Sequence, residues 1–361
     1  MKSSPAATTI NARLPLIALA LGACAIGFAP IFVRLSPVEP TATGFWRLAL
    51  ALPFLFALRY FLHRLPLPST PSKPHLARVP IAAADMQAAE VGGPNFLGAK
   101  QPDSVWRYAL LLLPGFFFAG DLALWHWSIH FTTVANSTLL TNFAPIFVTL
   151  VAYFFLGERF DRRFPLGLLL AIAGAALLIR RSLEVSPDHL FGDLLGVCTA
   201  LFYAAYQLSV KRLRRDFSTL ALMFGSSLTG AVLLLALAIA SGESIWPAPI
   251  VLPTDLNFSG GAAIAETLTK IVRGFFQSWG PLFGLALVSH IAGQGLIAYA
   301  FAHLSASFSS VSLLIQPIVA TITAYYLFGE ALGPIEVLGA GIVLAGVVLA
   351  RLATRDADRG A

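Results

Sequence analysis

Ten apolar segments, most of them about 20 residues long, constrain this chain more than any other feature of its sequence. An α-helix rises about 1.5 Å per residue, so about 20 residues cross a hydrocarbon core of about 30 Å. Lipid offers no water to pair with backbone N–H and C=O groups, whereas a helix pairs them internally. The pattern therefore predicts an all-α integral membrane protein with ten transmembrane helices.

The predicted spans fall into two groups of five. The first group covers residues 14–33, 42–62, 106–128, 134–156 and 164–179, and the second covers residues 190–210, 219–239, 279–301, 307–328 and 335–350. Composition agrees, because 57% of the 361 residues are hydrophobic and only 12% are charged, against roughly 25% charged residues in soluble domains. The lipid bilayer is the expected partner of most of the surface.

Lys and Arg residues lie between the apolar segments and predict the orientation. Cytoplasmic loops collect these residues, and an N-terminus placed inside puts 18 of the 24 on the cytoplasmic side. Five fall outside, including Arg180 and Arg181, and Arg47 lies within a span. We predict a multi-pass protein of the plasma (inner) membrane with both termini in the cytoplasm. The net charge of +6 then reflects the membrane surface, and no nucleic-acid partner is expected.

The sequence repeats itself internally. A shift of 174 residues places Cys24 on Cys198, and a shift of 172 places Pro145 on Pro317. The shift of 172 also superimposes Ser137, Thr149, Tyr153, Gly157, Glu158, Gly167 and Gly174 on Ser309, Thr321, Tyr325, Gly329, Glu330, Gly339 and Gly346. We predict one half over residues 1–182 with a long cytoplasmic loop at 65–104, and a second half over residues 190–352 with a long outer loop at 241–277.

Five spans in each half have a topological consequence. Because five is odd, the second half must enter the membrane from the opposite side, so the two five-helix repeats are inverted. Inverted repeats are typical of secondary transporters, in which a central site faces either side in turn. The alternative is that the duplication only built a stable bundle.

Several motifs resemble the drug/metabolite transporter superfamily, specifically its ten-helix EamA-type members. They are Phe45–Leu48 in the second span, Ser137, Pro145 and Leu156–Glu158 in the fourth, and Pro317 with Phe328–Glu330 in the ninth. The resemblance extends over nearly all the apolar sequence, and the two long loops depart from it. It implies an EamA-like bundle that exports or takes up metabolites, amino acids or toxic compounds by exchange or proton coupling.

Arg47 and Asp121 are candidate pathway residues because ionisable side chains are costly within a bilayer. Arg47 lies about five residues from the outer end of its span, and Asp121 lies about fifteen residues, roughly 22 Å, from the inner end of its span. An ion pair between them fits this geometry and would serve as a proton switch that opens when Asp121 is protonated. The alternative is that Arg47 reaches the outer surface and Asp121 pairs structurally.

Polar residues near the predicted midplane form a second set of candidates. Asn142, His290 and Gln316 lie at similar depths, where polar groups need partners. Gln294 shares a helix face with His290 at the i, i+4 spacing, as Trp125 does with Asp121. These residues line a substrate pathway in the functional interpretation, and they make hydrogen bonds between packed helices in the structural one.

Pro145 and Pro317 occupy equivalent positions within their spans. Each removes a backbone hydrogen bond and predicts a helix break, and paired breaks in inverted repeats mark binding regions. Glycines such as Gly167, Gly174, Gly339 and Gly346 permit close helix contact, either within the chain or in a homodimer.

We therefore predict a transporter, not an enzyme, that moves a small metabolite, amino acid or drug-like compound by alternating access. Export is favoured, and a proton gradient or a counter-substrate supplies the energy. Phosphate-cradling, zinc-binding and nucleophile-elbow motifs do not occur in the sequence, so no cofactor or metal is expected. The alternatives are an intramembrane enzyme that acts on a lipid-linked substrate through Asp121, His126 or His290, and a non-transporting membrane scaffold.

Overall fold

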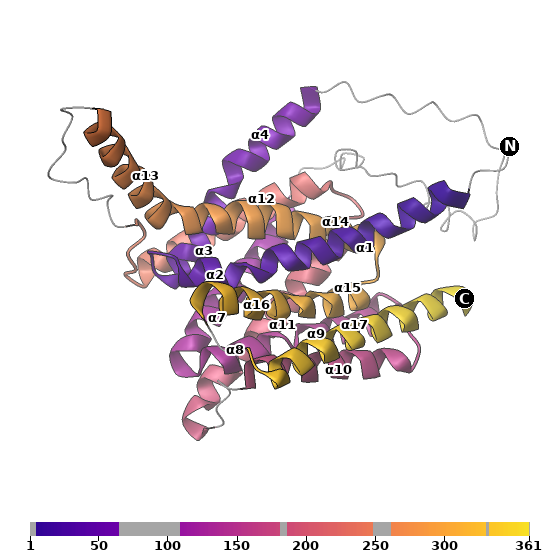
Figure 1. The fold of residues 1–361 in the computed structure, drawn as a ribbon. Helices are drawn as coiled ribbons and strands as arrows, with labels where there is room; N and C mark the ends of the chain where they lie inside the picture. Colours follow the sequence, from indigo (N-terminus) through magenta and orange to yellow (C-terminus); the bar gives the residue numbers. More distant parts are fainter. Residues whose placement is uncertain (1–4, 65–108, 181–185, 248–260, 330–331, 361) are drawn as a thin grey trace.

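The computed structural model describes residues 5–64, 109–180, 186–247, 261–329 and 332–360, and these residues contain helices and no strand. The helices form one elongated bundle (Figure 1). The first turn of α1 and the last turn of α17 lie at the same end of this bundle, which we call the terminal end. An even number of membrane crossings produces this arrangement.

The described residues of the first half form eight helices. They are α1 (Pro5–Gly27), α2 (Ala29–Arg34), α3 (Pro40–Ala49), α4 (Ala51–Arg64), α7 (Leu112–Phe131), α8 (Val134–Thr141), α9 (Ala144–Phe155) and α10 (Arg163–Ile179).

The second half follows the same order after a short 3-10 turn. Its elements are η2 (Pro187–His189), α11 (Leu190–Leu213), α12 (Thr219–Ala240), α13 (Gly261–Gly284), the π-helix η3 (Leu285–Gln294), α14 (Gly295–His303), α15 (Ala306–Ser312), the 3-10 turn η4 (Leu313–Ile315), α16 (Gln316–Phe328) and α17 (Pro334–Gly360).

Eight helical segments within the described residues are long and apolar enough to cross a membrane. The predicted all-helical membrane fold is thus confirmed. The other two predicted spans correspond to α10, a shorter apolar helix of 17 residues, and to α7, a helix of 20 residues that carries Asp121 and two histidines. The count of ten spans stays a prediction.

The two predicted loops have different outcomes. The loop at 65–104 lies outside the described residues. The predicted outer connection at 241–277 is helical from residue 261 onward, because α13 begins at Gly261 and continues into η3. Apolar residues recur there at positions 264, 268, 271 and 275, the spacing of one helix face. The polar residues between them hid this helix from a search for continuous apolar runs.

The two halves pack as the internal repeat requires. Helix α1 packs against η3 and α14, and its counterpart α11 packs against α7. Two further extensive contacts join counterparts directly: α3 with α12, and α10 with α17. Exchanging the halves leaves this set of contacts unchanged, so the halves are related by an approximate two-fold axis.

Glycines bring α10 and α17 into backbone contact. A Cβ built on Gly346 would lie 2.5 Å from the carbonyl oxygen of Gly167, and a Cβ on Gly174 would lie 2.7 Å from that of Gly339. The repeat exchanges these two contacts, since Gly339 and Gly346 are the counterparts of Gly167 and Gly174. Packing within one chain, rather than a dimer contact, therefore occupies these four glycines.

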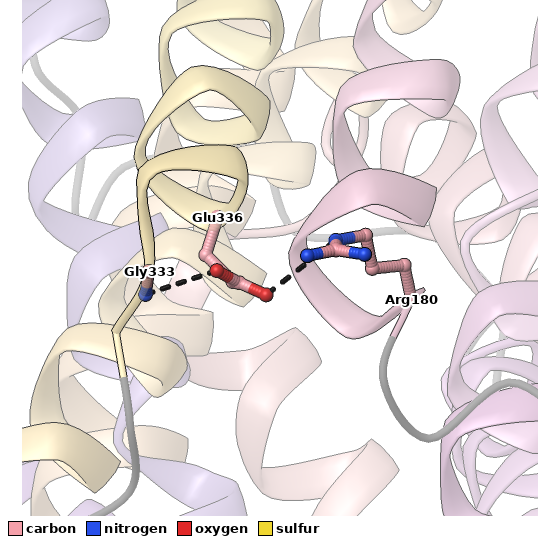
Figure 2. Close-up of polar contacts among 3 residues, drawn as sticks. All are labelled: Arg180, Gly333 and Glu336. Atoms are coloured by element: carbon pink, nitrogen blue, oxygen red, sulfur yellow. Dashed lines mark hydrogen bonds and ion pairs between the residues drawn. The ribbon is translucent and has the colours of Figure 1, made fainter.

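An ion pair joins the C-terminal end of α10 to the N-terminal end of α17 (Figure 2). The Glu336 carboxylate is 3% exposed; it accepts a hydrogen bond from the backbone N–H of Gly333 at 2.9 Å and lies 3.6 Å from Nε of Arg180. Arg180 was one of the basic residues that opposed the predicted orientation. A buried carboxylate beside it accounts for its position.

We expect Gly346→Val to destabilise the bundle and Gly341→Val to be tolerated. A side chain at position 346 must displace backbone of α10, which costs about 1–3 kcal/mol, whereas nothing lies within 4 Å of a Cβ at position 341 of the same helix. Thermal unfolding in detergent measures the difference. Equal melting temperatures for the two variants would contradict the close contact of α10 with α17.

Candidate functional site

A cavity lies between the two halves, away from the terminal end of the bundle. It encloses about 1040 Å³ of atom-free space, including the part open to solvent. Helices α1, α2, α3, α7 and α8 line it from the first half, and α11, η3 and α16 line it from the second. The lining residues from the first half lie at the C-terminal end of α1, along α2 and α3, and between residues 118 and 126 of α7. Since α2 follows α1 and α3 begins the next span, the cavity lies toward the end of the bundle opposite the terminal end. We call it the large cavity.

Contacts with the second half fix the position of α3, the helix that carries Arg47. Glu243, which follows α12, accepts a hydrogen bond from the backbone N–H of Ala42 in the first turn of α3 at 2.9 Å. Trp46 donates its indole N–H to the carbonyl oxygen of Ile245 at 2.7 Å, and its ring packs edge-on against Trp246. These contacts between halves hold Arg47, the next residue of α3, at the cavity wall.

Arg47 and Asp121 both line the large cavity and are 6% and 8% exposed. The guanidinium carbon of Arg47 lies 5.1 Å from the ring centroid of Phe118. Among the described residues, Arg47 and Asp121 form no ion pair within 4.0 Å, and Arg47 Nε has no hydrogen-bond partner. The direct pair that the sequence suggested is thus not formed in this state, because each charged group faces the cavity.

Four other predicted residues join this pair at the cavity wall, namely Trp125, Asn142, Gln294 and Gln316. The amides of Asn142 and Gln316 each carry a buried nitrogen without a hydrogen-bond partner in the part of the chain that the structure describes. A ligand that accepts hydrogen bonds would satisfy these groups.

The helices are interrupted at both predicted prolines. Helix α8 ends at Thr141 and α9 begins at Ala144 with Pro145 in its first turn, while η4 separates α15 from α16, which has Pro317 in its first turn. Pro317 lines the large cavity, and Pro145 lies outside the set of lining residues. The break before Pro145 instead leaves Asn142 as the residue that ends α8 and faces the cavity.

His290, the remaining polar candidate, lies outside the lining of the large cavity and makes the hydrogen bond between packed helices that the structural alternative described. It is 1% exposed, its Nε2 lies 2.8 Å from the Ser227 hydroxyl, and its ring stacks on Phe118 with centroids 5.8 Å apart. These contacts hold the His290 ring between α7 and α12, whereas Gln294, one turn further along the π-helix η3, lines the cavity.

Several cavity residues lie outside the predicted set, including Phe118, Thr138 and Thr141. None of them is ionisable near neutral pH, so a search for charged groups within spans overlooked them. The internal repeat could have identified one of them, because the shift of 172 places Phe118 on His290, a predicted pathway residue. These two counterparts stack on each other, and the approximate two-fold axis therefore passes between them.

The terminal end of the bundle is closed by polar contacts between the halves. Glu158, which follows α9, accepts hydrogen bonds from the backbone N–H groups of Ala306 and Ser307 at 2.6 and 3.1 Å and from the Ser307 hydroxyl at 2.7 Å. Within the second half, Lys211 also donates to the carbonyl oxygen of Leu304 at 2.5 Å. A site that is open at one end and closed at the other is the arrangement that alternating access requires.

A model of the EamA-like transporter family matches residues 88–180 and 190–352. A probable terminal-alkyne amino-acid exporter of Streptantibioticus cattleyicolor is 26% identical over 283 residues, which make up 76% of this chain and 82% of that exporter. A pseudopaline exporter of Pseudomonas aeruginosa is 25% identical over 203 residues, which are 56% of this chain and 61% of the exporter.

A solved crystal structure of a protein with 16% sequence identity overlays on 96% of this chain and 99% of its own, with a TM-score of 0.65. At this identity, the likeness shows a shared fold alone.

We expect Arg47→Met and Asp121→Asn to leave the melting temperature of the protein in detergent unchanged or raised. Neither substitution removes a direct partner from the other residue, and a buried charge without a pair costs free energy. Glu336→Gln is the matched control, because this carboxylate has partners and its loss should cost about 1–3 kcal/mol. A drop of similar size for Asp121→Asn would show that Asp121 has a structural role.

Proposed function

Since this chain belongs to the EamA-like transporter family, we propose that it is a secondary transporter that carries a small polar metabolite by alternating access through the large cavity. The observation that carries this proposal is that two buried charged residues of opposite sign, Arg47 and Asp121, line the cavity without forming an ion pair with each other. Membership of a transporter family argues against the rival interpretation as an intramembrane enzyme or as a scaffold.

The chemistry of the cavity wall supports a substrate with both a carboxylate and a cationic or donor group. Arg47 offers a cationic donor for a carboxylate, and the amides of Asn142 and Gln316 add neutral hydrogen-bonding groups. Asp121 offers an acceptor for an ammonium or hydroxyl group, and the ring of Trp125 covers apolar substituents. Two relatives carry names of amino-acid and pseudopaline exporters, which agrees with an amino-acid-like substrate and with export.

Asp121 is the residue that we assign to energy coupling. A substrate ammonium and a proton can compete for the same carboxylate, so a proton that binds from the outer side would favour release of the substrate. Exchange of one substrate for another needs no such step. A substitution of Asp121 should therefore affect proton-driven export and spare substrate exchange.

Asp121→Asn tests this assignment in proteoliposomes that are screened with pooled amino acids, related metabolites and cationic drugs. We expect the variant to lose accumulation driven by an imposed pH gradient and to retain exchange of labelled for unlabelled substrate. Asp161→Asn is the control, because it makes the same chemical change at a carboxylate that is 39% exposed outside the helices. Wild-type coupling in Asp121→Asn would contradict a role in proton transfer, and coupling lost in both variants would point to an unspecific charge effect.

We also propose that the protein resides in the plasma membrane with its terminal end in the cytoplasm, so that the large cavity faces outward. The distribution of Lys and Arg supports this orientation. A green fluorescent protein fused to the C-terminus should therefore fluoresce, and Ser244→Cys, at the opposite end of the bundle, should react with a membrane-impermeant maleimide added to intact cells. A dark fusion together with no reaction at position 244 would reverse the assigned orientation.

A further inference from the structure

A second, smaller cavity lies beside the large one in the second half of the bundle. It has about 210 Å³ of atom-free space and no room for a water molecule. Tyr203 and Gln294 line both cavities. Gln207 and Val210, which follow Tyr203 on α11 toward its C-terminus, line only the smaller one. Because α11 ends at the terminal end of the bundle, the small cavity extends from the large cavity toward that end.

The internal repeat maps the small cavity onto the large one. On α11, the shift of 174 takes Tyr203 to Ala29. The same shift takes Gln207 to Val33. Both counterparts belong to α2 and line the large cavity.

The shift of 172 extends this correspondence to the other elements. It takes four further lining residues of the small cavity to lining residues of the large one, namely Gln294, Ile297, Ala298 and Leu313 to Leu122, Trp125, His126 and Thr141. Six of nine lining residues therefore map onto the large cavity. Since 22 of 361 residues line the large cavity, a random mapping would place fewer than one of the nine there.

We propose that the small cavity is the closed counterpart of the large cavity, and that its opening at the terminal end presents Gln207 to the substrate as a hydrogen-bonding ligand. This inference rests on the proposed transport function. It adds a second binding position for the polar groups of the same small metabolite, and unlike the large cavity this position is built from uncharged side chains.

Unpartnered polar atoms support the proposal. Gln207 is 2% exposed, and neither its amide nitrogen nor its amide oxygen has a hydrogen-bond partner among the described residues. Leaving such groups buried and unpaired costs free energy, which the molecule tolerates where another state satisfies them. Two further buried residues fit this pattern: Ser310 Oγ and His290 Nδ1 also have no partner within the described chain. Their counterparts, Thr138 and Phe118, line the large cavity.

Three contacts close the small cavity in the present state. The Tyr206 hydroxyl donates to Gln294 Oε1 at 3.3 Å, and the Tyr206 ring stacks on Phe118 with centroids 4.8 Å apart. Both contacts separate the small cavity from the large one, since Phe118 lines the large cavity and Tyr206 the small one. At the terminal end, the Lys211 contact with Leu304 joins α11 to the segment before α15. Opening requires these contacts to break.

Cysteine labelling tests the proposal without a known substrate. In a background with Cys24→Ala and Cys198→Ala, Gln207→Cys and its counterpart Val33→Cys are treated with a membrane-impermeant maleimide from either face. We expect Val33→Cys to react from the face opposite the terminal end, and Gln207→Cys to react only from the terminal face, with a preference on the order of tenfold or more. Complete reaction of both variants in dodecyl sulfate verifies that each thiol is present. Reaction of Gln207→Cys from neither face, or from the opposite face, would overturn the proposal.

Transport kinetics provide a second test once a substrate is known. Gln207→Leu should raise KM at the terminal face about tenfold, the ratio that corresponds to 1.4 kcal/mol, and leave KM at the opposite face unchanged. Gln316→Leu is the matched control and should do the reverse, because Gln316 lines the large cavity whereas its counterpart, Ala144, does not. Equal effects of Gln207→Leu at both faces would contradict the proposal.

The two tests separate this inference from the proposed function. If wild-type protein transports a compound while Gln207→Cys stays unreactive at the terminal face, transport stands and the assignment of the small cavity fails. If Gln207→Cys reacts from the terminal face and no screened compound moves, the opening stands and the proposed transport function is contradicted for those compounds.

Discussion

The structure depends on one constraint: a backbone group that crosses a bilayer must find its hydrogen-bond partner inside the protein. Helices satisfy this constraint, so every interruption of a span is informative. Four interruptions among the described spans occur after Gly27, at Asn142, along the π-helix that ends at Gln294, and before Gln316. All four named residues line the large cavity. These four interruptions therefore lie where side chains, solvent or a ligand can satisfy the backbone groups.

Two-fold pseudosymmetry gives this cavity its second state. The repeat pairs Phe118 with His290 at the centre, and the glycine contacts of α10 with α17 exchange with each other across the same axis. Packed interfaces of this kind favour discrete arrangements over continuous deformation. The large and small cavities occupy equivalent positions in the two halves, so closing one while opening the other exchanges the environments of the halves and preserves most of the packing between them.

Much of the fold could be predicted from the sequence, because lipid imposes a length and a polarity on each span. The sequence also indicated the repeat shift, the two prolines and the candidate residues Arg47 and Asp121. The sequence did not reveal α13, whose apolar residues are spread over one face instead of forming a run. It could not tell that His290 packs against Phe118 and Ser227 outside the large cavity while Gln294 lines it. It also missed Phe118, since an uncharged side chain in a span carries no sign of whether it faces lipid, protein or a cavity.

In the proposed transport cycle, the divergence between the two halves determines the order of events. In the present state, Arg47 and Asp121 face an open cavity, while the amide of Gln207 is buried without a partner. Closing the large cavity removes two charges from water, which costs more than the burial of one neutral amide. The empty protein should therefore rest with the large cavity open. A substrate that pairs with both charges removes most of that cost, and an exchange of protons at Asp121 removes part of it. Binding energy is thus converted into a conformational change only when both charges are neutralised, which links the chemistry of the substrate to the direction of its movement.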